Sequence, residues 1–415
     1  MEAFARETLP NGLRVVVEPI PHVRSVSVGL WYGVGSRHED SATSGLSHFM
    51  EHMFFKGTAR RSAREIAETM DRVGGQLNAV TTKEYTCIYT RVLDEHFSLG
   101  LDVISDMALR PRLDEGDLEK EKGIVLEEIK LYEDTPDELI HDFLARTMWD
   151  GHSLGRSVLG VAAAVKQFDR ERLLGFYNAY YRPANMVLAV AGHVDPAAIR
   201  EAAAAAFAGL TGGSSPPAGG TPQRVSRREV RRKDTEQVHL AVGAPGVPLE
   251  HPDMYTLQLL SMTLGGGTSS RLFQQIREER GLAYSVFSYT GSYCDTGLLG
   301  IYAGVSPEQA APVLDLIREE LASVARQGVS EEELERAKDQ VKASIVLALE
   351  STSSRMSRLG RGELLLGRIL ETDEVVARVD AVTLEDALRV ARACLDPEGL
   401  TVCAIGPVDS DLAPT

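Results

Sequence analysis

The chain has 415 residues, of which 43% are hydrophobic and 25% are charged, so it is too long for one ordinary core, and its composition excludes a disordered or membrane-embedded protein. Its formal net charge of -16 argues against a general affinity for nucleic acid or anionic lipid. The four cysteines are scattered and have no C-x-x-C spacing, which predicts reduced thiols in the cytoplasm. The sequence has no apolar run typical of a signal peptide or a membrane span, which predicts a cytoplasmic enzyme with no membrane partner.

Strand and helix patterns fill the first half of the chain. An Asn11-Gly12 turn precedes a run rich in β-branched residues, and Val26, Val28 and Leu30 alternate in the strand that follows. Further patterns predict helices at residues 62–73, 95–108, 115–133, 136–149 and 169–179, and strands at 76–81, 85–92 and 186–192. Together they predict an α+β domain in which helices pack against a mainly antiparallel sheet.

The stretch from Gly45 to Thr58 contains the pattern H-x-x-E-H, formed by His48, Glu51 and His52. Residues three and four apart share one face of a helix, so both imidazoles could bind one metal ion with Glu51 at the same edge. This pattern is the inverted form of the H-E-x-x-H motif of zinc peptidases. The alternative is a pair of ordinary core or surface histidines, because a short motif needs structural context.

A catalytic zinc ion needs a third protein ligand, and periodicity favours Glu128. In the helix expected at 113–134, the residues three and four positions from Glu128 are apolar or aromatic, whereas Glu127 has a glycine and a lysine among its neighbours. Burial of an unpaired carboxylate is costly, so a buried Glu128 indicates a cation such as zinc. Glu121, two turns earlier on nearly the same face, could orient a ligand or a water. The alternative is a helix whose carboxylates are all solvated.

A segment rich in Gly, Ser and Pro at residues 212–223 predicts a linker between two domains, at residues 1–211 and 224–415. Residues 224–233 carry six arginines and lysines. With a strongly negative chain and no interleaved aromatic residues, they predict a solvated linker edge or a first strand rather than a nucleic-acid site.

The second domain repeats the order of strands and helices of the first. When Thr268 is aligned with Thr58, the positions opposite the motif residues are Gln258, Ser261 and Met262. We therefore expect a domain duplication in which only the first copy has the metal site and the second helps to hold substrate.

Four further stretches accompany the motif in order: Leu9-Pro-Asn-Gly12, Gly75-Gln-Leu-Asn-Ala-Val-Thr81, Glu121-Lys-Gly-Ile-Val-Leu-Glu-Glu128 and Tyr181-Arg-Pro-Ala-Asn185. With these residues the chain resembles the pitrilysin family of zinc peptidases, most closely the branch of mitochondrial processing peptidase and its bacterial relatives. The resemblance covers nearly the whole chain. It implies two homologous α+β domains, each a mainly antiparallel sheet packed against helices, which form half of a clam-shell chamber.

The resemblance also implies the roles of the motif residues. His48, His52 and Glu128 would hold one zinc ion per chain. Glu51 would be the general base, and Glu121 would be the supporting acid.

Substrate-binding residues follow from the same resemblance. Asn78 and Ala79 would lie on an edge strand that pairs with an extended peptide. Arg277 and Tyr284 match a pair in the second domain that reaches the bound peptide and assists catalysis. The alternative for this pair is an ordinary helix-end arginine and a strand tyrosine.

Glu138 and Asp142 stand four apart on one expected helix and so share a face. In the processing-peptidase branch, acidic residues at matching positions hold an arginine before the cleaved bond, and a carboxylate pair suits a guanidinium. The alternative is a solvated acidic helix start that complements the helix dipole.

The predicted activity is that of a zinc-dependent endopeptidase acting on peptides or unfolded polypeptides. The alternative is a zinc-binding subunit of a heterodimeric peptidase that is inactive without its partner. The resemblance implies either a homodimer or a heterodimer with an inactive homologue.

Overall fold

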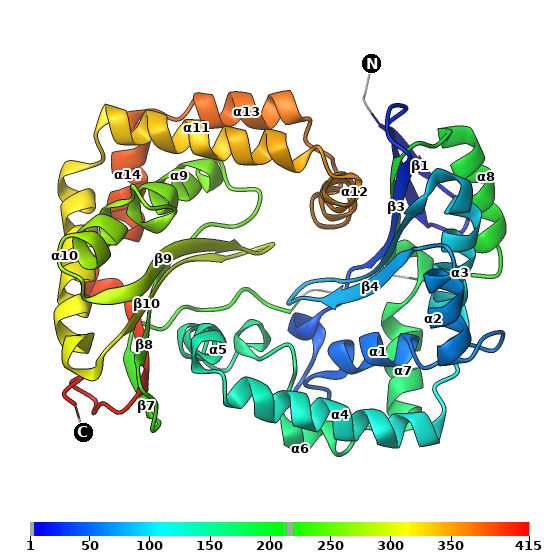
Figure 1. Ribbon diagram of the computed structural model, residues 1–415, viewed down its shortest axis with the longest axis horizontal. Coiled ribbons are helices and arrows are strands. Elements are labelled where there is room, and N and C mark those ends of the chain that lie inside the picture. The colour runs from blue at the N-terminus through cyan, green and yellow to red at the C-terminus, as the bar shows by residue number, and fades with distance from the viewer. Residues whose placement is uncertain (1–3, 211, 214–218, 415) are drawn as a thin grey trace. The chain divides into compact units, whose positions relative to one another are not determined.

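The computed structural model describes residues 4–210, 212–213 and 219–414, so residues 214–218 of the predicted linker lie outside the described residues. The chain forms two compact units (Figure 1). The units are not two continuous halves of the chain, because residues 131–155 belong to the second unit and residues 347–371 to the first. The prediction of homologous domains at 1–211 and 224–415 concerns repeats along the sequence and stays a prediction.

The first unit is built on a six-stranded sheet with the order β1-β2-β6-β3-β5-β4. Only β2 and β6 run parallel, and the other neighbours are antiparallel. The strands are β1 (Ala5–Thr8), β2 (Arg14–Pro19), β3 (Ser25–Tyr32), β4 (Gln76–Thr81), β5 (Thr86–Leu93) and β6 (Met186–Gly192). The mainly antiparallel sheet predicted for this part of the chain is confirmed.

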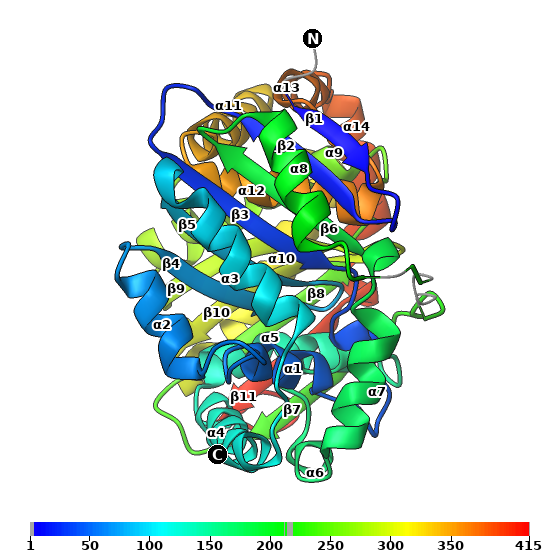
Figure 2. The same ribbon diagram turned by 90° about the vertical axis from the view of Figure 1, so that its right-hand side faces the viewer.

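One face of this sheet is covered by helices from the first half of the chain. Alternate residues of β3, Val26, Val28 and Leu30, are fully buried on that face, as their spacing predicts. Figure 2 shows α3 and α8 lying across it. The helices that the first half of the chain gives to this unit are α1 (Leu46–Phe54), α2 (Ala63–Asp71), α3 (Phe97–Leu109), α4 (Glu115–Glu133, of which the residues up to Lys130 belong to this unit), α6 (Ala162–Val165), α7 (Arg170–Tyr180) and α8 (Pro196–Ala206).

The opposite face is covered by α12 (Thr352–Arg361), which comes from far along the chain (Figure 1). Met356 and Gly360 of this helix pack closely over Gly29 and Trp31 of β3. A π-helical turn (Gly362–Leu366) that follows α12 places the fully buried Glu363 in an ion pair with the half-exposed Arg6, 2.7 Å from Nε to Oε2. No local pattern in the sequence predicts this packing.

The second unit has a five-stranded sheet with the order β7-β11-β8-β10-β9. Its strands are β7 (Arg228–Arg232), β8 (Val238–Pro245), β9 (Ala283–Ser292), β10 (Gly297–Val305) and β11 (Thr401–Gly406). Here β7 and β11 are parallel and the remaining pairs antiparallel. The order and directions repeat those of β2-β6-β3-β5-β4, and α9 follows β8 as α1 follows β3.

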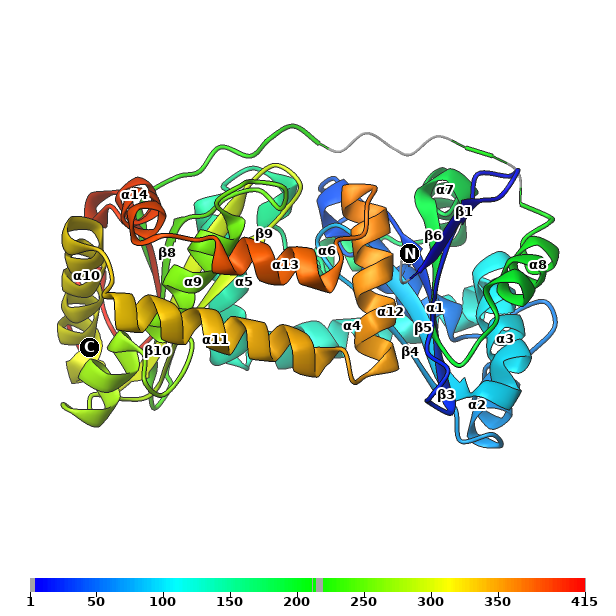
Figure 3. The same ribbon diagram turned by 90° about the horizontal axis from the view of Figure 1, so that it is seen from above.

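The helices of the second unit cover both faces of its sheet. On one face, α5 (Pro136–Met148) packs Ile140 and Leu144 against Ala241 and Ile405. The other face carries most of the remaining helices, among which α10 and α14 pack together (Figures 1 and 3). These helices are α9 (Met254–Gly265), α10 (Ala310–Gln327), α11 (Glu331–Ala348, of which the residues up to Val346 belong to this unit), α13 (Thr372–Asp380) and α14 (Leu384–Cys394).

The fold is therefore of the predicted α+β class, with two sheets that each pack against helices. None of the helices in the described part of the chain combines the length and the apolar character that crossing a membrane requires.

Candidate metal centre and active site

The motif residues lie on α1, as predicted. The helix is held in the core of the first unit by Leu46, Phe49 and Met53, all fully buried. The rings of His48 and His52 lie side by side, with 4.6 Å between their centroids. The spacing of the two histidines on a buried helix therefore presents both imidazoles at one place.

The third predicted ligand reaches the same place from α4. Oε2 of Glu128 lies 3.8 Å from Nε2 of His48 and 3.6 Å from Nε2 of His52. One ligand atom from each of the three residues lies within 4.8 Å of the others, and no other group of three or more His, Cys, Asp or Glu in the described part of the chain does so. The structure thus brings together the three residues that the sequence singled out.

These three residues fit a zinc ion. In a tetrahedral site with bonds of about 2.0–2.1 Å, neighbouring ligand atoms lie about 3.4 Å apart, close to the two separations observed here. Oε2 of Glu128 is buried and has no hydrogen-bond donor among the described residues. A buried carboxylate oxygen without a donor is costly unless a cation neutralises it. Two imidazoles and one carboxylate also leave a fourth position for water.

The protonation state of His48 suits a metal ligand. Burial, aided by the neighbouring His52, lowers its pKa to about 4. His48 is therefore neutral near pH 7, and a neutral ring has a nitrogen lone pair to offer a metal.

Glu121 contacts Nδ1 of His52, whose Nε2 faces Glu128, while its role as a supporting acid stays a prediction. Its carboxylate Oε2 lies 3.1 Å from Nδ1 of His52. Because a carboxylate only accepts, Nδ1–H is the donor, which leaves Nε2 of His52 free to face Glu128. The other oxygen of Glu121 lies 2.7 Å from Nζ of Lys56, a contact that no pattern in the sequence predicts.

Glu51 is held beside the histidines by the hydroxyl of Thr81. Oγ1 of Thr81 donates to Oε2 of Glu51 at 2.5 Å, across from α1 to the end of β4. Burial raises the pKa of Glu51, and the charge of Glu128 raises it further, while Thr81 and His52 oppose the shift. Thr81 belongs to the stretch Gly75–Thr81 that resembles the pitrilysin family, but only the tertiary structure shows that Thr81 contacts Glu51.

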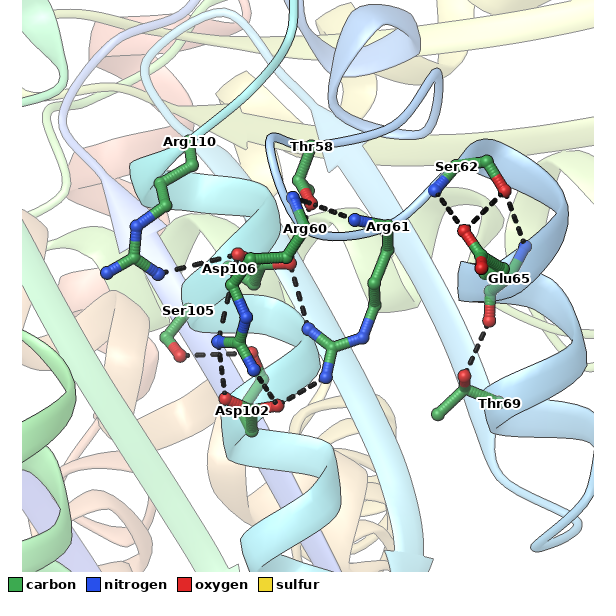
Figure 4. Close-up of polar contacts among 10 residues, drawn as sticks. All are labelled: Thr58, Arg60, Arg61, Ser62, Glu65, Thr69, Asp102, Ser105, Asp106 and Arg110. Atoms are coloured by element: carbon green, nitrogen blue, oxygen red, sulfur yellow. Dashed lines mark hydrogen bonds and ion pairs between the residues drawn. The ribbon is translucent and has the colours of Figure 1, made fainter.

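The segment that leaves α1 is anchored to α3 (Figure 4). The hydroxyl of Thr58 donates to the fully buried carboxylate of Asp106 at 2.7 Å. Arg61 also bonds to Asp106, at 2.8 Å, and to Asp102. Ser62 caps α2 reciprocally with Glu65. These contacts hold the segment that directly follows Lys56 against α3.

The apolar stripe predicted around Glu128 is only partly correct. Ile124 and Leu131 are exposed, because the buried face of α4 runs through Leu118, Glu121 and Val125. Glu128 continues that face one turn further, with 39% of its side chain exposed. Glu128 therefore faces the two histidines although two of its expected apolar neighbours are exposed, and its role as a ligand stays a prediction.

Asn78 and Ala79 lie on β4, at the edge of the first sheet. Among the described strands β4 pairs only with β5, so its other edge can accept a further strand. A pocket of about 640 Å³ opens between β4 and α2, with Ile66, Met70 and Leu77 in its walls. The predicted pairing of this strand with a peptide is tested by no observation here and stays a prediction.

Arg277 and Tyr284 lie in the second unit. Arg277 lies in a π-helical turn (Phe273–Glu278), and its guanidinium stacks over the rings of Phe273 and Tyr284, at 4.8 and 4.9 Å from their centroids. Tyr284, in β9, is 78% exposed. The pair is therefore brought together, while its contact with a bound peptide stays a prediction.

Glu138 and Asp142 lie on α5 of the second unit, one turn apart. The hydroxyl of Tyr132 donates to the carbonyl oxygen of Glu138 at 3.1 Å. Burial, aided by the charges of Asp142 and Glu138, raises the pKa of Tyr132. Glu138 is exposed and Asp142 is half-buried. Their role in binding an arginine stays a prediction.

The fold is shared with solved bacterial proteins. A protease from Helicobacter pylori superposes with a TM-score of 0.92, at 24% identity over 97% of this chain and 99% of its own. A peptidase M16 inactive domain from Pseudomonas fluorescens also gives 0.92, at 19% identity over 99% of both chains. At these identities the comparison shows the fold alone.

Sequence comparison shows the family. Residues 14–162, which include all three candidate ligands, match the family described as insulinase (peptidase family M16), and residues 167–341 match the peptidase M16 inactive domain. An uncharacterized zinc protease of Bacillus subtilis is 45% identical over 97% of this chain and 98% of its own length. One from Streptomyces coelicolor is 43% identical over 97% and 89%. The chain therefore belongs to the M16 family of insulinase- and pitrilysin-like peptidases, as its sequence motifs predicted.

Proposed function

We propose that this chain is a zinc-dependent endopeptidase in which His48, His52 and Glu128 hold one zinc ion and Glu51 transfers protons. The observation that carries the proposal is the convergence of one oxygen and two nitrogen ligand atoms within 4.8 Å. The names of the relatives, zinc proteases, agree with it.

The chemistry divides between the metal and the chain. When bound, zinc lowers the pKa of a water molecule and polarises a carbonyl group. Glu51 takes a proton from the water that attacks the scissile carbonyl and then gives it to the leaving nitrogen. A raised pKa suits a carboxylate that must both accept and release a proton, and burial raises that of Glu51. The bond from Thr81 keeps this carboxylate in place between the two steps.

The edge of β4 that pairs with no other described strand is the proposed binding site for the substrate backbone. An extended peptide would add a strand beside Asn78 and Ala79, with main-chain hydrogen bonds supplying affinity. Thr81, in the same strand, contacts Glu51, so a peptide on this edge would pass the proposed base. This arrangement favours peptides or unfolded segments, because their backbone N–H and C=O groups are not already paired within a fold.

The second unit is proposed to contribute substrate contacts. Arg277, stacked on Tyr284, has polar hydrogens to offer to peptide carbonyl groups, and the exposed hydroxyl of Tyr284 can do the same. Glu138 and Asp142 are proposed to bind a basic side chain near the cleaved bond. We further propose that the chain works as a dimer, either with itself or with an inactive homologue.

The alternative, a zinc-binding subunit that needs a partner for activity, predicts no turnover by the purified chain. The experiment is to assay the chain alone, loaded with zinc, on unstructured peptides. Glu51→Gln should retain zinc and lose at least about 100-fold in turnover, the usual scale for one general base. The matched control is Glu127→Gln, which changes an exposed carboxylate on α4. Full activity of Glu51→Gln would rule out this mechanism.

A further inference from the structure

The helix that carries the metal motif begins without a capping side chain of its own. Its N-cap is Gly45, which has φ 93° and no side chain to accept a hydrogen bond. By contrast, α2, α7 and α8 are capped by their own Ser62, Asp169 and Asp195. The N–H groups of a first helical turn have no partner within the helix, so α1 needs an acceptor from elsewhere.

Glu39 supplies that acceptor. Its two carboxylate oxygens accept from the backbone N–H groups of Gly45 and Ser47, both at 2.7 Å. The side chain is nearly fully buried, so water does not compete for these bonds. A carboxylate at a helix N-terminus also interacts favourably with the helix dipole. Ser47 directly precedes the candidate ligand His48.

No residue at position 45 could replace this cap. A Cβ on Gly45 would lie 2.6 Å from the carbonyl oxygen of Leu159, and one on Gly160 would lie 2.3 Å from that of Ser44. The two glycine backbones therefore pass each other too closely for side chains. The start of α1 is enclosed, and its capping group has to come from Glu39.

The segment that carries Glu39 is tied to the hairpin between β4 and β5. The N–H of Ser36 donates to the carbonyl of Thr82 at 3.1 Å, and that of Arg37 to the carbonyl of Lys83 at 2.8 Å. Arg156 donates to the carbonyl of Glu39 at 2.5 Å. The hairpin follows Thr81, which bonds to Glu51. Glu39 thus connects the start of α1 with the strand that positions the proposed base.

We infer that Glu39 is a positioning residue of the metal site: its carboxylate fixes the first turn of α1, and with it His48, relative to Glu51 and Glu128. This inference rests on the proposed zinc site. Substitution of a residue that orients a metal ligand without binding the metal itself commonly lowers metal affinity about 10- to 100-fold. An amide at position 39 can accept one of the two N–H bonds but presents its own N–H₂ group to the other.

The test compares Glu39→Gln with Asp40→Asn at about pH 8, where the carboxylate of Glu39 is ionised. Asp40 is a matched control, because it also accepts from backbone N–H groups, those of Ala42 and Thr43, but not from α1. Zinc affinity is measured by competition with a chelator, and the geometry of the site by the visible absorption spectrum of the cobalt-loaded protein. We expect zinc binding about 10-fold weaker in Glu39→Gln, with a changed cobalt spectrum. Asp40→Asn should match wild type in both.

The outcomes separate this inference from the proposed function. A wild-type chain that binds no zinc would overturn the proposed function itself. Wild-type affinity and an unchanged cobalt spectrum in Glu39→Gln would overturn the positioning role alone. If Glu39→Gln does not fold, Glu39→Asp decides, because it keeps the charge on a side chain one methylene shorter. The inference then requires weaker zinc binding than that of the wild type, and a wild-type value would contradict it.

Discussion

Lys56 and Glu121 form an ion pair, 2.7 Å from Nζ to Oε1, directly behind the candidate ligand His52. Glu121 is only 2% exposed, and its other oxygen accepts the N–H of His52. A buried carboxylate that loses its cation is left with a large desolvation cost. The charge of Lys56 therefore offsets part of the cost of burying this carboxylate in the metal-free protein.

Replacement of Lys56 by methionine should destabilise the metal-free protein by about 1–3 kcal/mol, because the buried carboxylate of Glu121 loses its partner. The zinc-loaded protein should lose less, since the bound ion supplies positive charge through His52. Thermal unfolding with EDTA and with excess zinc measures both effects. Lys120→Met, which removes an exposed lysine from α4, is the control. An equal loss of stability in the metal-free and the zinc-loaded protein would contradict this account.

Glu128→Gln and Glu127→Gln should differ in zinc content. Glu128 is the carboxylate that faces both histidines, whereas Glu127 is exposed and pairs with Lys130 at 2.6 Å. An amide oxygen is a poorer zinc ligand than a carboxylate, so only Glu128→Gln should be purified with little zinc. Metal analysis of the two purified variants is the measurement. Equal zinc in both would remove Glu128 from the set of ligands.

Met356→Ala should destabilise the first unit, although it lies in the last fifth of the sequence. Met356 is 1% exposed, and its sulfur lies over Gly29 at the centre of the sheet. Truncation of such a core methionine costs about 2–5 kcal/mol. Urea unfolding measures the loss, with the exposed Leu347→Ala as the control. Wild-type stability of Met356→Ala would show that α12 contributes little to this unit.

The raised pKa of Glu39 predicts that the free energy of unfolding decreases as the pH rises. Burial raises its pKa from 4.5 to about 7, against the two backbone N–H bonds and the charge of Arg156. Between these values the folded protein holds a proton that the unfolded chain has released. Its stability therefore falls as the pH rises through this window, by about 3 kcal/mol at most.

Glu39→Gln has no titrating group at this position. The difference in unfolding free energy, wild type minus variant, should therefore decrease from about pH 5 to about pH 7.5 and then level off. Urea unfolding of the metal-free proteins across this range measures it. A difference that is constant with pH would show that the pKa of Glu39 is not raised.

Local periodicity was sufficient for much of the fold and of the metal centre. The alternation of Val26, Val28 and Leu30 predicted a strand with one buried face, and the predicted helix at 115–133 matches α4. The spacing of His48 and His52 alone places both rings on one side of a helix, because that geometry is set by the helical repeat. Such features depend on residues within a few positions of each other.

Contacts between distant segments were decided only by the tertiary structure. Thr81 meets Glu51, Lys56 meets Glu121, and Glu39 caps α1, although none of these partners shares an element with the other. The packing of α12 on the first sheet joins residues more than 300 positions apart, such as Ser27 and Thr352. The sequence by itself determined which side chains could hold a metal, since ligand chemistry and helical spacing are local properties. Which groups hold those ligands in place depended on how sheets and helices pack, and packing is set by the summed burial of the whole chain rather than by any short pattern within it.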